Sequence, residues 1–252
     1  MKQNIFIDTD ICDDIDDLWA LILALNVSQF HIIGISLAMG NTLEKAQFMA
    51  KLLSDLGRTD IPLFVGAQTD DRPNFHEAYY HDFNLTNYQG KIYDGLDHTE
   101  DLFCQYQQIT ILSLAPMRNV QTMFEQNKDL SSKASVIVMG GALRRGYLFE
   151  ERPGPEYNIL MDLKAAKYVF KHAKNCILAP LDVCREFIIK GRNYDRIKTS
   201  HKQDLSILIE NYKLWDKTYE GGAIKFDVNT SSTILYDVVP IVYLLHPDYF
   251  KR

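Results

Sequence analysis

The sequence lacks an excess of basic residues and any long apolar run. Its 252 residues contain 27 lysines and arginines against 33 aspartates and glutamates, so the formal net charge is −6 at pH 7. No segment is rich in Lys and Arg, and the backbone of a nucleic acid is therefore not an expected partner. No stretch is long and apolar enough to predict a membrane span, so we expect no membrane partner either.

Paired cysteine motifs are absent as well. The four cysteines are widely spaced, and none stands in a C-x-x-C pair, which predicts neither a zinc site nor a disulfide framework. The apolar run after Met1 is interrupted at Asp8, which is not the pattern of a signal peptide. We therefore expect a cytoplasmic protein with reduced thiols.

Short apolar, β-branched segments alternate with helical patterns along most of the chain. We interpret six of them as buried strands: the residues before Asp8, then 31–38, 61–65, 109–114, 134–139 and 176–181. This pattern predicts an α/β fold with a single open, mostly parallel twisted sheet flanked by helices. The length suits one large domain, which we expect to cover residues 1–252.

Residues 66–107 interrupt this alternation. The stretch is aromatic and polar, and it shows no clear helical or strand periodicity. A connection of this length without regular structure is usually functional or mobile. We therefore expect it to be a functional or mobile connection.

Six aspartates crowd the loop between the first strand and the first helix: Asp8, Asp10, Asp13, Asp14, Asp16 and Asp17. Carboxylates so close together repel one another unless a cation or exposure to water relieves them. Asp16 and Asp17 stand at the expected helix start, where backbone N–H groups favour negative charge. A hard cation with oxygen ligands, Ca²⁺ or Mg²⁺, would gather these acids. The alternative is a solvated loop in which one Asp caps the helix.

In this loop the chain resembles the calcium-dependent nucleoside hydrolases, the inosine-uridine preferring family. A longer version of that family's signature, D-x-D-x-G followed by a D-D pair and an apolar helix, matches Asp8, Asp10, Asp16 and Asp17. The resemblance runs from about residue 4 to 245. It is marked again at Gly40-Asn41, Met139-Gly140-Gly141, Glu156-Tyr157-Asn158 and Asp237.

The resemblance implies hydrolysis of the N-glycosidic bond of a ribonucleoside to free base and ribose. Asp10 would be the base that activates a Ca²⁺-bound water. The implied Ca²⁺ ligands are the carboxylates of Asp10, Asp17 and Asp237 and the main-chain carbonyl of Arg118. The implied contacts to the ribose hydroxyls are Asp16, Asn41, Glu156 and Asn158. Family members commonly form dimers or tetramers, so a homodimer or homotetramer is expected.

The chain departs from the family pattern at three places. Cys12 replaces a glycine, and because Cys does not take φ > 0 without steric cost, we expect the loop path to differ there. Tyr236 replaces a histidine that assists the leaving base, so Tyr236 either donates a proton or only stacks on the base. The histidine of the family's substrate loop has no clear match within 66–107.

These departures leave two other functions open. One is a catalytically impaired relative that still binds ribose or a nucleoside. The other is a Mg²⁺-dependent phosphatase of the haloacid-dehalogenase type, in which Asp8 of Asp8-Thr9-Asp10 would be the nucleophile.

Overall fold

The computed structural model describes residues 2–70, 74–148, 150–219 and 226–250. In that part of the chain, one all-parallel sheet has the strand order β4-β3-β2-β1-β5-β6-β7. Its strands are β1 (Gln3–Thr9), β2 (Phe30–Leu37), β3 (Leu63–Val65), β4 (Ile92–Asp94), β5 (Ile109–Ser113), β6 (Ala134–Met139) and β7 (Asn175–Ala179). The predicted single open parallel sheet is confirmed.

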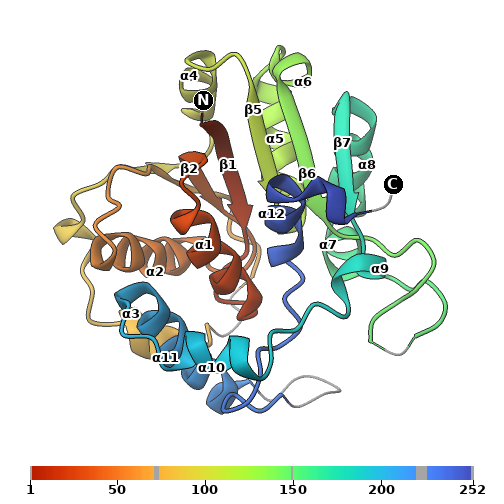
Figure 1. Ribbon diagram of the computed structural model, residues 1–252. Helices are drawn as coiled ribbons and strands as arrows, with labels where there is room; N and C mark the ends of the chain where they lie inside the picture. Colours follow the sequence, from red (N-terminus) through yellow and green to blue (C-terminus); the bar gives the residue numbers. More distant parts are fainter. Residues whose placement is uncertain (1, 71–73, 149, 220–225, 251–252) are drawn as a thin grey trace.

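Helices cover both faces of this sheet (Figure 1). They are α1 (Asp16–Asn26), α2 (Thr42–Asp55), α3 (Glu77–Tyr80), α4 (Thr99–Cys104), α5 (Arg118–Gln126), α6 (Leu130–Lys133), α7 (Tyr157–Met161), α8 (Leu163–His172), α9 (Leu181–Cys184), α10 (Arg192–Lys198), α11 (Gln203–Thr218) and α12 (Val238–Leu245), with 3-10 turns η1 (Leu85–Asn87) and η2 (Pro247–Tyr249). Among the described residues, no helix has the length and apolar character needed to cross a membrane.

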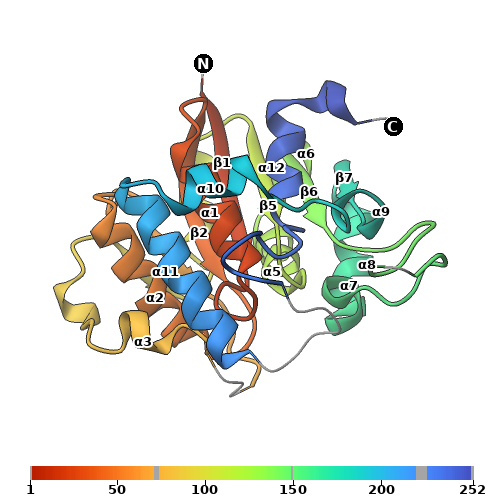
Figure 2. The same ribbon diagram turned by 60° about the horizontal axis from the view of Figure 1, so that its bottom comes forward.

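Successive side chains of β1 enter two different cores. Ile5 and Ile7 face the core shared with α1, α2, α11 and α12, whereas Phe6 faces the core shared with α4, α5 and α8. This alternation follows from the two-residue period of a strand, and both faces are buried as in other parallel sheets. In Figure 2, α10 and α11 lie over α1, and Trp19 of α1 meets Tyr212 of α11 edge to face at 6.4 Å.

The strand order places β1 at the point where the direction of winding changes. From β1 the chain builds outward through β2, β3 and β4, and then returns to β5 on the other side of β1. Loops that leave β1 and β5 therefore diverge and open a crevice beyond the carboxyl ends of the strands. The acidic loop leaves β1 at this crevice.

Residues 66–107 contain one strand that the sequence pattern did not indicate. β4 lies in this stretch and pairs in parallel with β3, from Leu63 opposite Ile92 to Val65 opposite Asp94. It has three residues, forms the edge of the sheet and is partly exposed. So short a strand cannot produce the alternating pattern by which longer strands are predicted.

Candidate functional site

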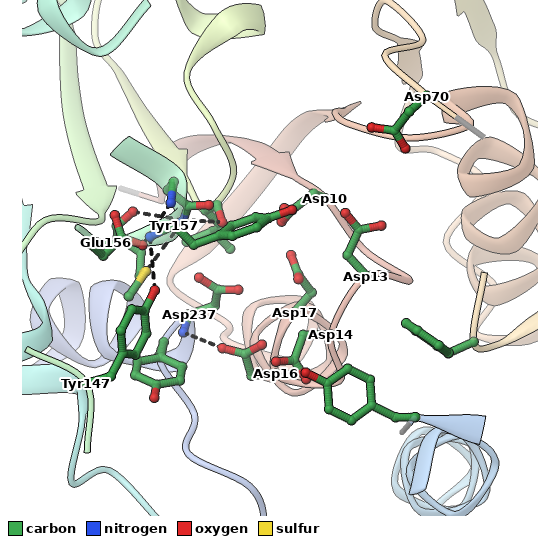
Figure 3. A pocket seen from close by; sticks show the side chains of 16 residues that line it. Asp10, Asp13, Asp14, Asp16, Asp17, Asp70, Tyr147, Glu156, Tyr157 and Asp237 are labelled. Atoms are coloured by element: carbon green, nitrogen blue, oxygen red, sulfur yellow. Dashed lines mark hydrogen bonds between the residues drawn. The ribbon is translucent and has the colours of Figure 1, made fainter. Parts of the chain in front are cut away.

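A cavity of about 850 Å³ lies at the carboxyl ends of the strands (Figure 3). Its wall is formed by Asp10, Asp13, Asp14, Asp16, Asp17, Asp70, Phe75, Leu114, Met139, Tyr147, Glu156, Tyr157, Asn158, Tyr219, Tyr236 and Asp237. Most of the residues predicted to be functional are among these. Asn41 and Arg118 are not. Asp70 and Phe75 come from the stretch 66–107.

Three buried carboxylates from opposite ends of the chain converge at the cavity floor. Asp16 and Asp17 begin α1, Asp237 precedes α12, and each offers an oxygen within 4.8 Å of the other two. The backbone N–H of Asp237 also donates to Asp16 Oδ2 at 3.2 Å. Asp10 lies beside this group (Figure 3) and is only 5 % exposed. Such buried oxygen donors fit a hard divalent cation.

The pKa values of these acids show how costly their charges are without a cation. Burial, and then the neighbouring Asp13, raises the pKa of Asp10 to about 8. Burial and the carboxylates around them raise the pKa values of Asp16, Asp17 and Asp237 well above the usual range. None of the residues described as lining the cavity is a Lys, Arg or His. A counter-charge comes from the buried Lys45 ammonium behind the wall, which lowers the pKa values of Asp10 and Asp17 but does not offset their burial, so a metal ion at the cluster still fits.

The acidic loop turns sharply between Asp10 and Asp13. The Asp13 N–H donates to the Asp10 carbonyl at 3.1 Å, and Cys12 has φ 80° while Ile11 keeps a negative φ. This combination is that of a type II turn, which favours Gly at the position that Cys12 occupies. Cys12 thus adopts the left-handed conformation that a glycine allows, in spite of its steric cost.

Thr9 holds one of the clustered aspartates in place, a contact that the sequence pattern did not predict. Its hydroxyl donates to Asp17 Oδ1 and accepts from the backbone N–H of Ile11 at 3.1 Å. It therefore ties the end of β1 to the first turn of α1. The only sequence signal was its place between Asp8 and Asp10, where a short hydroxyl side chain can reach a neighbouring backbone group.

Glu156 and Asn158 stand on the cavity wall opposite the acidic loop. Glu156 caps α7 and accepts from the backbone N–H groups of Asn158, Ile159 and Gly141 at 2.9, 3.0 and 2.8 Å. Asn158 donates to the carbonyls of Leu114 and Met139, both at 3.1 Å. These bonds fix both side chains before any ligand binds.

Asn41 and Arg118 have other roles in the structure. Asn41 caps α2, accepting from the Glu44 N–H at 3.2 Å and donating to Glu44 Oε1 at 2.9 Å. Arg118 opens α5, and its guanidinium pairs with Asp162 at 2.8 Å while its carbonyl accepts from the Thr122 hydroxyl at 3.0 Å. Neither residue lines the cavity.

Two pairs of aromatic rings contribute to the apolar part of the wall, beside Leu114 and Met139. Tyr147 meets Tyr236 edge to face at 5.9 Å, and Phe75 meets Tyr219 edge to face at 5.3 Å. Burial, followed by the Asp16 carboxylate, raises the pKa of Tyr236 above its ordinary value. Tyr147 was not predicted, because it lies in an irregular loop between β6 and α7 that carries no periodic pattern.

The position of Asp8 removes the phosphatase alternative. Asp8 is fully buried, accepts from the Ser36 hydroxyl at 2.6 Å and from Asn119 Nδ2 at 2.9 Å, and does not line the cavity. A nucleophile must reach its substrate, which Asp8 cannot do from this place.

The fold and the site together define an α/β protein with a small-molecule cavity and a cluster of buried carboxylates that fits a divalent metal. The family model for the inosine-uridine preferring nucleoside hydrolases matches residues 5–252. The chain therefore belongs to this metal-dependent family and is a nucleosidase, an enzyme acting on N-glycosyl compounds. Membership in this family excludes the phosphatase hypothesis independently of the position of Asp8.

Relatives of known name agree with this assignment. The pyrimidine-specific ribonucleoside hydrolase RihA of Escherichia coli O139:H28 is 28% identical over 257 residues, covering 93% of this chain and 78% of the relative. The purine-preferring ribonucleoside hydrolase from Gardnerella vaginalis has a TM-score of 0.76 at 19% identity, over 99% of this chain and 82% of that one. A plant nucleoside hydrolase, PpNRh1, has a TM-score of 0.75 at 20% identity, over 100% and 81%.

We predict that Cys12→Gly is more stable than Cys12→Ala by about 1 kcal/mol, because both lose the thiol but only Gly relieves the positive φ. At a position with a negative φ, the alanine variant would be the more stable of the two, because glycine loses more backbone conformational freedom on folding. Urea denaturation of both variants at one Ca²⁺ concentration measures the difference. An alanine variant at least as stable as the glycine variant would contradict the strained turn.

The raised acid pKa values predict how metal-free stability depends on pH. The folded acids hold protons that the unfolded chain releases above about pH 4, so in EDTA the melting temperature should fall as the pH rises from 5 to 8. Saturating Ca²⁺ binds the ionised carboxylates, and its stabilisation should therefore grow with pH. At 100 times the Kd it reaches about 2.7 kcal/mol, or roughly 5–10 °C.

Differential scanning calorimetry with and without Ca²⁺ at several pH values tests this prediction. Asp17→Asn serves as the control, because it replaces a charged carboxylate of the cluster by a neutral amide and should abolish most of the Ca²⁺ shift. A wild-type melting temperature that ignores Ca²⁺ at pH 8 would count against a metal at this cluster.

Proposed function

We propose that Asp10, Asp17 and Asp237 hold Ca²⁺ at the cavity floor while the enzyme hydrolyses the N-glycosidic bond of a ribonucleoside. The observation that carries this proposal is the convergence of Asp16, Asp17 and Asp237, with Asp10 beside them, at one cavity of about 850 Å³, which has room for a whole nucleoside. The resemblance adds the main-chain carbonyl of Arg118 as a fourth ligand. That oxygen accepts from the Thr122 hydroxyl and, as the first carbonyl of α5, also from the helical N–H of Thr122, so ligation would require it to give up one of these bonds.

Asp10 is the base in this proposal. A bound Ca²⁺ would supply a water of lowered pKa, although the effect is smaller than that of zinc. Asp10 then takes the proton of the water that attacks C1′ of the ribose. The carbon passes through an oxocarbenium-like state, and the carboxylates beneath the sugar stabilise its positive charge.

Asp16, Glu156 and Asn158 would hold the ribose hydroxyls. Each lines the cavity, and the protein contacts described above fix each side chain in place before substrate arrives. Such preorganisation turns binding energy into correct orientation of the sugar for attack. Asn41 is left with its role as the cap of α2.

The departing base faces the aromatic part of the wall. Tyr236 and its neighbour Tyr147 are placed there, and the Tyr236 hydroxyl can donate a hydrogen bond to the base as the bond to C1′ breaks. Alternatively, Tyr236 only stacks on the base. RihA is named for pyrimidines and the Gardnerella enzyme for purines, so the resemblance does not select one base for this chain.

We also propose that the protein works in the cytoplasm as a homodimer or homotetramer. All four cysteines are unpaired, which supports a reducing compartment. The oligomeric state is inferred from the resemblance to the family.

A panel of ribonucleosides with Ca²⁺ tests the reaction. We expect at least one of uridine, cytidine, inosine, guanosine and adenosine to release reducing sugar, and Asp10→Asn to lower kcat by about 10³-fold, because it loses the base. Binding of a ribonucleoside without release of free base would instead identify the impaired relative. Hydrolysis of p-nitrophenyl phosphate with Mg²⁺, and of no nucleoside, would reverse the exclusion of a phosphatase.

Tyr236→Phe separates the two roles of Tyr236. If the hydroxyl assists the leaving base, kcat should fall by about 10-fold or more while KM changes little, because the interaction develops only in the transition state. Steady-state kinetics on the best substrate measure both constants. Tyr147→Phe is the matched control for loss of a phenol from the same wall. Equal effects on kcat and KM at position 236 would support stacking.

A further inference from the structure

Lys45 is a charged residue buried behind the acidic loop. It lies on α2, is 2 % exposed, and its ammonium donates to the Asp10 carbonyl at 2.8 Å and to Asp13 Oδ1 at 2.6 Å. Lysine is almost never buried to this extent unless it is paired, because removing an ammonium group from water is costly. Packing alone therefore does not explain why a lysine occupies position 45.

The two bonds of Lys45 close the same turn that Cys12 strains. The Asp10 carbonyl accepts both from the Asp13 N–H, which forms the turn, and from the Lys45 ammonium. Asp13 at the far end of the turn is held by the same ammonium. The Lys45 ammonium thus holds both ends of the turn that carries the Asp10 side chain.

Lys45 can act as a firm anchor because α2 is itself fixed. The Asn41 carbonyl accepts the backbone N–H of Lys45 at 3.2 Å, and the Thr42 hydroxyl donates to the Gly66 carbonyl at 2.7 Å. The helix start is therefore tied to the loop that follows β3. A group that holds a site is effective only when it is itself held by packing and hydrogen bonds.

We propose that Lys45 is a positioning residue whose ammonium holds the Asp10–Asp13 turn and so keeps the Asp10 carboxylate beside the cluster of Asp16, Asp17 and Asp237. The inference rests on the proposed function, in which Asp10 is both metal ligand and base. Lys45 itself touches neither the substrate nor the reacting atoms, since it does not line the cavity.

The positive charge of Lys45 and its positioning role have opposite effects on the affinity for Ca²⁺. As a nearby positive charge alone, Lys45 repels Ca²⁺, and its removal would tighten Ca²⁺ binding. As a positioning residue, it preorganises a ligand, and its removal should weaken Ca²⁺ binding. The direction of the change therefore separates the two roles.

The experiment compares Ca²⁺ binding and catalysis in the full-length wild type and in Lys45→Met. We expect the Kd for Ca²⁺, measured by calorimetry, to rise about 10-fold, in the range found for groups that orient metal ligands. At saturating Ca²⁺, kcat for the best ribonucleoside should fall about 10²-fold from misplacement of Asp10. KM should change much less, because the ribose contacts remain.

Lys51→Met is the matched control. Lys51 lies on the same helix and pairs with Asp55 at 2.8 Å, away from the cavity, so its loss removes a lysine and an ion pair from α2 without touching the turn. Its Kd for Ca²⁺ and its kcat should match those of the wild type.

The double variant Lys45→Met/Asp13→Asn guards against misfolding. Removing both partners avoids leaving the Asp13 carboxylate without the ammonium, which is the main cost of breaking a buried pair. It should fold, as judged by circular dichroism, and still bind Ca²⁺ more weakly than the wild type.

Each result decides the question. If the wild type itself binds no Ca²⁺, the proposed function fails. If the wild type binds Ca²⁺ but the folded Lys45 variants bind it equally well or more tightly, the positioning role is wrong while the proposed function stands. A lower melting temperature with an unchanged Kd for Ca²⁺ would likewise show a merely structural role.

Discussion

Mutual repulsion among buried carboxylates is the constraint on which this structure depends. Asp16, Asp17 and Asp237 bring three acids within 4.8 Å of one another, and Asp10 stands beside them with its pKa raised to about 8 by burial. A fold that kept these groups together without a cation would lose free energy at neutral pH, because each ionised group would be both desolvated and repelled. The arrangement is favourable only for a protein that binds a divalent ion there, or that uses the negative charge to stabilise a cationic sugar.

The sheet topology makes this convergence possible. β1 lies where the winding changes direction, so its loop opens into the crevice, and α1 carries Asp16 and Asp17 to the crevice floor. α12 shares its core with α1, which brings Asp237 to the same place from the far end of the chain. The site therefore forms only when the whole sheet has formed, and its metal affinity is coupled to folding of the entire chain.

The sequence predicted the parts of the structure that repeat or crowd together. The longer strands were predicted because they are continuous apolar runs, and the acid cluster because six aspartates in one loop require an explanation. β4 was missed because three edge residues show no period. Tyr147, Phe75 and Lys45 were not predicted, because their roles arise from contacts between segments distant in the chain. Asn41 does not line the cavity, because its side chain caps the start of α2 and accepts the backbone N–H of Glu44 there.

The departures from the family pattern can be understood as local changes on a retained framework. Cys12 keeps a positive φ although it costs energy for a residue with a Cβ, so other contacts must hold the turn. The Asp13 N–H and the Lys45 ammonium both bind the Asp10 carbonyl and supply such contacts. Tyr236, by contrast, changes the chemistry at the leaving base and not the backbone, since the following Asp237 keeps its place in the acid cluster. Substitution has therefore been tolerated where neighbouring bonds preserve the positions of the acids.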